Sequence, residues 1–94
     1  MEIKEIEVYS EASNSDIVRM PGRRFPGCVI QGDSLSNLLC NAELVCSIAE
    51  RSGDEELIDA AAEVRDALLG RLAHYERVLG EHGISLPYNR PSRS

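Results

Sequence analysis

The sequence predicts an α+β fold in which a three-stranded antiparallel β-meander packs on an antiparallel helical hairpin. Two observations carry this prediction. The first third of the chain holds short apolar runs separated by polar connectors and Pro-Gly pairs, a pattern typical of short strands. The rest holds two long segments with apolar residues at helical spacing. The link between these segments, Ser52-Gly53-Asp54, is short enough to make the two helices antiparallel neighbours.

We expect strands at about residues 3–9, 16–20 and 27–31. The first alternates apolar with charged residues, the period-two pattern of a half-buried strand. Pro21 closes the second strand. The third, Cys28-Val29-Ile30-Gln31, is apolar enough to be the middle or best-covered strand.

Two Pro-Gly pairs, Pro21-Gly22 and Pro26-Gly27, bracket the connection between the second and third strands. Each pair favours a type II turn, because Pro presets φ near −65° and Gly accepts a positive φ. Arg23, Arg24 and Phe25 lie between the two turns. We therefore expect the turns to hold these three side chains at the surface or over the sheet edge.

The first helix is expected over about residues 34–51, with Asp33 accepting hydrogen bonds from the free amides of its first turn. Its apolar residues occupy more than half of the helix circumference, so the helix needs cover on two sides. We expect the sheet to supply one cover and the next helix the other. The polar arc that remains is formed by Ser36, Cys40, Glu43, Ser47, Glu50 and Arg51.

The second helix is expected over about residues 54–82. Ser52 and Glu55 have the spacing of a capping box, and Asp54 as N-cap is an equally acceptable start. Gly83 marks the end of the helix as a left-handed stop.

The length of 94 residues corresponds to one domain. We expect it to cover residues 1–88, with Leu86-Pro87-Tyr88 folding back on the body. Residues 89–94 are expected to form a flexible tail.

The formal net charge is −6, and the helical half carries most of the acidic surplus. An acidic body repels phosphate backbones, so we expect no nucleic-acid partner and favour a basic protein partner. The N-terminal residues alternate charged and apolar side chains, and no apolar run is long enough to span a membrane. We expect neither a targeting segment nor a membrane contact.

Three cysteines, Cys28, Cys40 and Cys46, form no C-x-x-C pair. Their odd number argues against a disulfide framework and favours a reduced, cytoplasmic setting. Cys40 lies on the polar arc of the first helix and is expected to react most readily with a thiol probe. His74 and His82 lack ligand-type partners at i+3 or i+4, so we expect no metal and no cofactor.

The stretch from Arg19 to Leu35, Arg-Met-Pro-Gly-Arg-Arg-Phe-Pro-Gly-Cys-Val-Ile-Gln-Gly-Asp-Ser-Leu, resembles a family of small bacterial proteins that form a domain-of-unknown-function group. The resemblance extends through Asp54-Glu-Glu-Leu-Ile58 and Leu72-Ala-His-Tyr-Glu76, and so covers most of the chain. It implies a soluble bacterial protein. It implies no activity, cofactor or catalytic residue.

An anion site is one functional hypothesis. The positive end of a helix dipole and two adjacent arginines together favour a bound anion. The residues are Arg23, Arg24, Phe25, Gln31 and Ser34.

The alternative is purely structural. In that interpretation the two arginines pair with Glu5, Glu7 or acids of the helices, and Asp33 already occupies the amides of the helix start.

Two further surfaces stand out on the second helix. An acidic face, suited to a basic partner or simply solvated, is formed by Glu56, Asp59, Glu63 and Asp66. A possible dimer stripe of apolar residues is formed by Ile58, Ala62, Leu69 and Ala73.

No nucleophile–base set, metal cluster or phosphate loop is evident in the sequence. Our leading hypothesis is therefore a non-enzymatic protein–protein interaction module, in one version an acidic immunity or inhibitor-type protein. The alternatives are a binder of a small anionic ligand and a structural homodimer that uses an edge strand or the stripe around Ile58.

Overall fold

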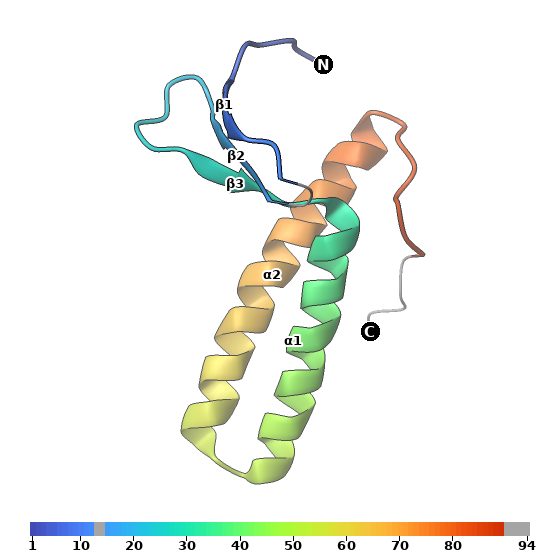
Figure 1. Cartoon of the computed structure of the whole chain (residues 1–94). Coiled ribbons are helices and arrows are strands. Elements are labelled where there is room, and N and C mark those ends of the chain that lie inside the picture. Colours follow the sequence, from blue (N-terminus) through green and yellow to red (C-terminus); the bar gives the residue numbers. More distant parts are fainter. Residues whose placement is uncertain (13–14, 90–94) are drawn as a thin grey trace. The chain divides into compact units, whose positions relative to one another are not determined.

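The structure, a computed structural model, describes residues 1–12 and 15–89 (Figure 1). It confirms the predicted α+β class, since a three-stranded antiparallel sheet is followed by a hairpin of two helices. The chain divides into two compact units, Met1–Gln31 with the sheet and Gly32–Ser94 with the helices. The elements are β1 (Glu7–Ser10), β2 (Asp16–Arg19), β3 (Gly27–Val29), α1 (Gly32–Ser52) and α2 (Glu55–Glu81).

The sheet has the order β1-β2-β3, so β2 is the middle strand. The prediction that the third strand is the middle or best-covered one is wrong: β3 is an edge strand whose three residues are all exposed. In a three-stranded meander the second strand is always the middle one, however apolar the third strand is. In agreement with this order, Val18 of β2 is buried. The paired residues are Glu7 with Arg19, Val8 with Val18 and Ser10 with Ile17, then Asp16 with Val29, Ile17 with Cys28 and Val18 with Gly27.

The first strand is shorter than predicted. It begins at Glu7, and Ile3 is almost fully exposed. The pairing register of this strand with β2 is irregular between Val8 and Ser10, which is the pattern of a β-bulge. Across the sheet, Arg19 donates a hydrogen bond to Glu7 and forms an ion pair with it.

The first Pro-Gly pair forms the expected turn, and the second does not. Gly22 has φ 80°, and the Arg23 amide donates to the Met20 carbonyl at 3.1 Å, as a type II turn requires. Gly27 instead begins β3 opposite Val18, where ladder pairing needs an extended backbone.

Helix α1 begins at Gly32, two residues before the predicted start. Asp33 therefore lies inside the first turn, where its Oδ1 accepts from the Ser34 amide at 2.8 Å. Ser36, expected on the wet arc, is buried.

The link between the helices is organised by Ser52 and Asp54. The Ser52 hydroxyl donates to the Ala49 carbonyl at 2.5 Å and accepts from the Asp54 amide at 3.1 Å, so Ser52 ends α1 rather than capping α2. Asp54 is the N-cap of α2, and its Oδ1 accepts from the amides of Glu56 and Leu57 at 3.1 and 3.3 Å. Of the two predicted starts, the Asp54 cap is the observed one.

Helix α2 runs without interruption through Gly70 and ends in the predicted stop. The Gly83 amide donates to the Gly80 carbonyl, and the Ile84 amide donates to the Leu79 carbonyl at 2.9 Å, which is the bond pattern of a Schellman motif.

Helices α1 and α2 lie side by side as a hairpin (Figure 1), and two buried clusters hold them together along its length. Near the open end, Leu35 and Leu39 of α1 meet Leu72 of α2, and partly buried Leu68, Tyr75 and Tyr88 pack against them. Near the link, Cys46, Ala49 and Ala61 form the second cluster with Ile58.

Tyr88 confirms the prediction that the segment after α2 folds back. Its ring packs against the cluster of Leu35, Leu39 and Leu72, and its hydroxyl donates to Glu76 Oε2 at 2.9 Å. The predicted tail, residues 89–94, lies outside the described residues apart from Asn89.

Candidate functional site

Helix α1 carries a second stripe beside the one that packs on α2. The buried residues Leu35, Leu39, Ala42, Cys46 and Ala49 repeat at alternating steps of four and three, which keeps them on the side that contacts α2. The neighbouring positions Leu38, Asn41, Val45 and Ile48 repeat in the same way. Three of these four are large apolar residues, and their side chains are 45 to 49% exposed: Leu38 45%, Val45 49% and Ile48 49%.

Helix α2 carries a matching stripe. Leu57, Ala60, Val64 and Ala67 follow one another at steps of three, four and three, so they share one side of the helix. Leu57 is 43% exposed and Val64 57%. We call the two stripes together the apolar face: Leu38, Val45 and Ile48 of α1 with Leu57, Ala60, Val64 and Ala67 of α2.

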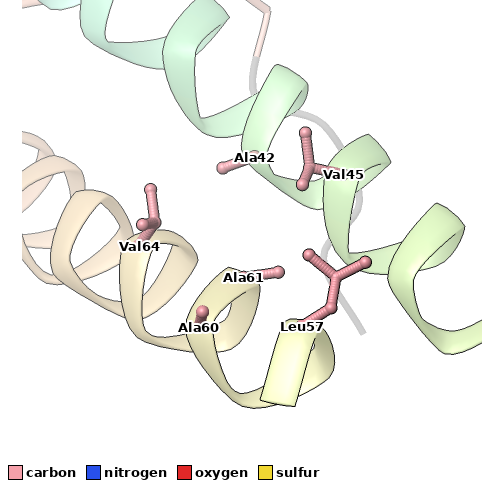
Figure 2. A pocket seen from close by; sticks show the side chains of 6 residues that line it. All are labelled: Ala42, Val45, Leu57, Ala60, Ala61 and Val64. Carbon is pink, nitrogen blue, oxygen red and sulfur yellow. The ribbon is translucent and has the colours of Figure 1, made fainter. Parts of the chain in front are cut away.

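A groove runs between the helices within this face. It is lined by Ala42, Val45, Leu57, Ala60, Ala61 and Val64, and its volume is about 250 Å³. Figure 2 shows Ala42 of α1 and Leu57 and Ala61 of α2 pointing into the space between the two helices. All six side chains consist of carbon and hydrogen alone, so the groove recognises shape and apolar surface only.

Charge is distributed unequally along the two borders of the apolar face. On α2 the border is acidic, because Glu56 and Glu63 lie one turn from Ala60 and are exposed. On α1 the border positions one turn from Ile48 are Leu44 and Arg51.

The acids of α1 after its first turn lie on its other side. Glu43 and Glu50 are each one turn from Cys46, beyond the buried stripe. The face is thus bordered by acids on α2, where the exposed Arg71 follows Ala67 one turn further along the stripe, and by apolar or basic residues on α1.

The sequence prediction that α1 needs cover on two sides is informative here. One stripe of α1 is covered by α2 through the two clusters, whereas Leu38, Val45 and Ile48 remain about half exposed. Of the two expected covers, the one by α2 is observed, and these three side chains are the apolar ones that α2 leaves accessible.

The arginine turn presents its side chains at the surface. Phe25 is 72% exposed, and the guanidinium of Arg24 lies 5.3 Å from the centre of its ring, a cation–π contact. Arg23 is also exposed. Within residues 1–12 and 15–89 no ion pair involves Arg23 or Arg24, while Glu7 bonds Arg19 and Tyr9.

The predicted anion site draws on both units of the chain. Gln31 is exposed and Ser34 is half-buried. The Ser34 amide donates a hydrogen bond to the side chain of its neighbour Asp33. At the same helix start, Gly32 is buried against the ring of Tyr75. One amide of the helix N-terminus is therefore already bonded within the chain.

The predicted acidic face is solvent-accessible, since all four of its residues are exposed: Glu56, Asp59, Glu63 and Asp66. Asp66 Oδ1 bonds the Arg65 guanidinium at 3.1 Å, and this hydrogen bond raises the pKa of Arg65.

The residues of the predicted dimer stripe do not form one exposed surface. Ile58 packs against Cys46, Ala49 and Ala61 inside the hairpin, while Leu69 and Ala73 are exposed.

Cysteine and histidine positions offer little for chemistry. Cys28 and Cys40 are exposed, and Cys46 is buried. Cys28 is exposed because β3, expected to be the middle or best-covered strand, lies at the edge of the sheet. His74 Nδ1 lies 2.7 Å from Arg77 Nη2, which donates to it. In the part of the chain that the structure describes, no three of His, Cys, Asp and Glu form a metal-binding group, and no helix is apolar and long enough to cross a membrane.

Sequence reasoning missed the apolar face as a separate feature. The signal was present as a second set of three-and-four spacings beside each core stripe, in residues 38–48 and 57–67. On a helical wheel the two sets merge into one wide apolar arc. The wheel therefore does not separate the residues that the other helix covers from those that stay exposed.

A family model described as "Family of unknown function (DUF6959)" matches residues 1–88. No curated protein and no solved structure matches the chain.

Proposed function

Because the chain belongs to DUF6959, a family of unknown function, its role has to be inferred from its own surface, and we propose that it is a non-enzymatic protein–protein interaction module. Its docking surface is the apolar face of the helical hairpin. The observation that carries this proposal is the exposure of Leu38, Val45, Ile48, Leu57 and Val64 on one side of two adjacent helices.

Clustered exposure of this kind is unfavourable for a free protein. Burying one large aliphatic side chain is worth about 1.5–3 kcal/mol, and five half-exposed ones leave several kcal/mol unrealised. Isolated surface Leu and Val residues are ordinary, but contiguous apolar patches mark interaction sites. The arrangement of this face therefore favours a partner that covers it.

The groove suits a protein better than a small molecule. Its volume of about 250 Å³ lies below the range of roughly 300–1,000 Å³ that is usual for ligand sites. Ligand sites also contain a few polar groups that fix orientation, whereas the six lining side chains have none. Side chains from a partner helix need no such groups, because ridges packing into grooves set their orientation.

Site-specific photo-crosslinking in the native host tests the proposal. Benzoylphenylalanine at position 45 of the apolar face should give a discrete protein adduct. The same probe at Ser47, exposed on the same helix but outside the face, is the matched control and should give little or none. Absence of an adduct from position 45, or equal adducts from both positions, would overturn the proposal.

A further inference from the structure

We infer that the occupant of the apolar face is a second copy of this chain, in a two-fold dimer in which α1 of each copy packs against α2 of the other. This inference rests on the proposed function, because it identifies the partner of the same surface. The result is a four-helix bundle built from two hairpins.

The spacing of apolar residues supports a bundle. In a two-helix hairpin each helix needs one apolar stripe, whereas in a four-helix bundle each helix contacts two neighbours. Both helices carry two adjacent stripes with the three-and-four repeat that is typical of such packing. Two hairpins supply the four helices that this pattern requires.

Side-chain size indicates which helices meet. The stripe of α1 contributes large residues, Leu38, Val45 and Ile48, and that of α2 contributes two alanines, Ala60 and Ala67. Within one hairpin, Cys46 lies level with Ala61 and Leu35 with Leu72.

A two-fold axis parallel to the helices leaves the height of each residue along the bundle unchanged, so residues that are level within one hairpin are also level between the two copies. It places Ile48 near the partner's Ala60 and Leu38 between the partner's Ala67 and the partner's Arg71, so that both large residues meet an alanine. Pairing α1 with α1 would oppose large residues and leave the alanines facing each other.

Charge favours the same pairing. The axis parallel to the helices places Arg51 beside Glu56 of the other copy, because both residues lie at the link end of the hairpin. A pairing of α2 with α2 would bring two acidic borders together, which costs free energy through like-charge repulsion.

The size of the surface predicts a reversible dimer. Two helices side by side are about 20 Å wide, and the 21 residues of α1 span about 31 Å, which gives roughly 600 Å² per copy. The two copies together contribute about 1,200 Å², the lower end of the range for specific interfaces. We therefore expect dissociation in the micromolar range.

Sedimentation of the full chain over concentrations from about 1 to a few hundred μM tests the proposal. The wild type should pass from monomer to dimer, and Val45→Glu should weaken association by about 100-fold, because each dimer buries two new charges. Leu69→Glu is the matched control on the other side of α2, and it should leave association unchanged. Far-UV circular dichroism verifies that both variants keep the hairpin.

Mixing two variants tests the pairing even if each one alone is monomeric. Val45→Glu and Val64→Lys place opposite charges on facing helices of a mixed dimer, so the mixture should associate at least tenfold more tightly than either variant alone. A wild type that stays monomeric throughout overturns the dimer. If crosslinking at position 45 still captures a different protein, the proposed function stands and only the identity of the partner is wrong. Loss of the dimer in Leu69→Glu but not in Val45→Glu would move the interface to the other side of the hairpin.

Discussion

The backbone of Gly32 lies against the hydroxyl end of the Tyr75 ring, so close that a Cβ at position 32 would overlap the ring. Gly32 is the first residue of α1 and Tyr75 lies six residues before the end of α2, so this contact holds the two helices together at the open end of the hairpin. The contact requires glycine for lack of space, because the φ angle of Gly32 is not among the positive ones.

We predict that Gly32→Ala destabilises the hairpin by about 1–3 kcal/mol, the usual cost of overpacking. Alanine would otherwise stabilise a helix by up to about 1 kcal/mol relative to glycine, so the sign of the effect is diagnostic. Urea denaturation followed by far-UV circular dichroism gives the free energy of unfolding. In a Tyr75→Ala background, Gly32→Ala should become neutral or stabilising. A Gly32→Ala effect of the same size in both backgrounds would show that the ring is not the cause.

Asp54 should contribute measurably as the N-cap of α2. Its carboxylate accepts two amide hydrogen bonds, so Asp54→Ala should lower the free energy of unfolding by about 1 kcal/mol. Asp54→Asn keeps an acceptor oxygen and should recover most of this loss. Asp59→Ala, on the exposed face of the same helix, is the control and should change stability by no more than about 0.5 kcal/mol. Equal effects at positions 54 and 59 would contradict the cap.

Tyr88 should anchor the segment after α2 through two separable interactions. Tyr88→Phe removes the hydroxyl that bonds Glu76 and should cost about 0.5–1.5 kcal/mol. Tyr88→Leu also removes the ring from the cluster of Leu35, Leu39 and Leu72 and should cost more. Thermal unfolding of the three proteins gives the order, and wild-type stability in Tyr88→Leu would rule out the anchor.

The three cysteines should react with a thiol reagent at different rates. Cys28 and Cys40 are exposed and Cys46 is buried, so iodoacetamide should modify the first two quickly and the third only when the hairpin opens. Peptide mass spectrometry over a time course measures each rate, and urea should accelerate Cys46 selectively. Fast modification of Cys46 in the native protein would contradict the packing of the cluster near the link.

The helical hairpin is well predicted by the sequence, because its signals are local. Apolar spacing, the Asp54 cap and the stop at Gly83 place the helix ends within two residues of those observed. The early start of α1 is the main error, since Asp33 bonds a neighbouring amide inside the helix and does not precede it.

The sheet and the site are less well predicted, because they depend on partners distant in sequence. Hydrophobicity of the third strand suggests a central place, but strand order follows from which residues pair, as Ile17 pairs with both Ser10 and Cys28. The contact between Gly32 and Tyr75 has no local signature at all. The apolar face is encoded in the spacing, yet only the structure separates residues that α2 covers from those that remain exposed.

The bulge in β1 has a consequence for how copies of this chain can join. An unprotected sheet edge recruits further strands, and natural sheets prevent this with bulges, charges and short edges. Here one edge strand is bulged between Val8 and Ser10 and carries the charged Glu7, and the other, β3, has only three residues with Pro26 immediately before it. These features disfavour strand addition at both edges of the sheet, and with it fibrous aggregation, so they are compatible with the proposed assembly through helix packing.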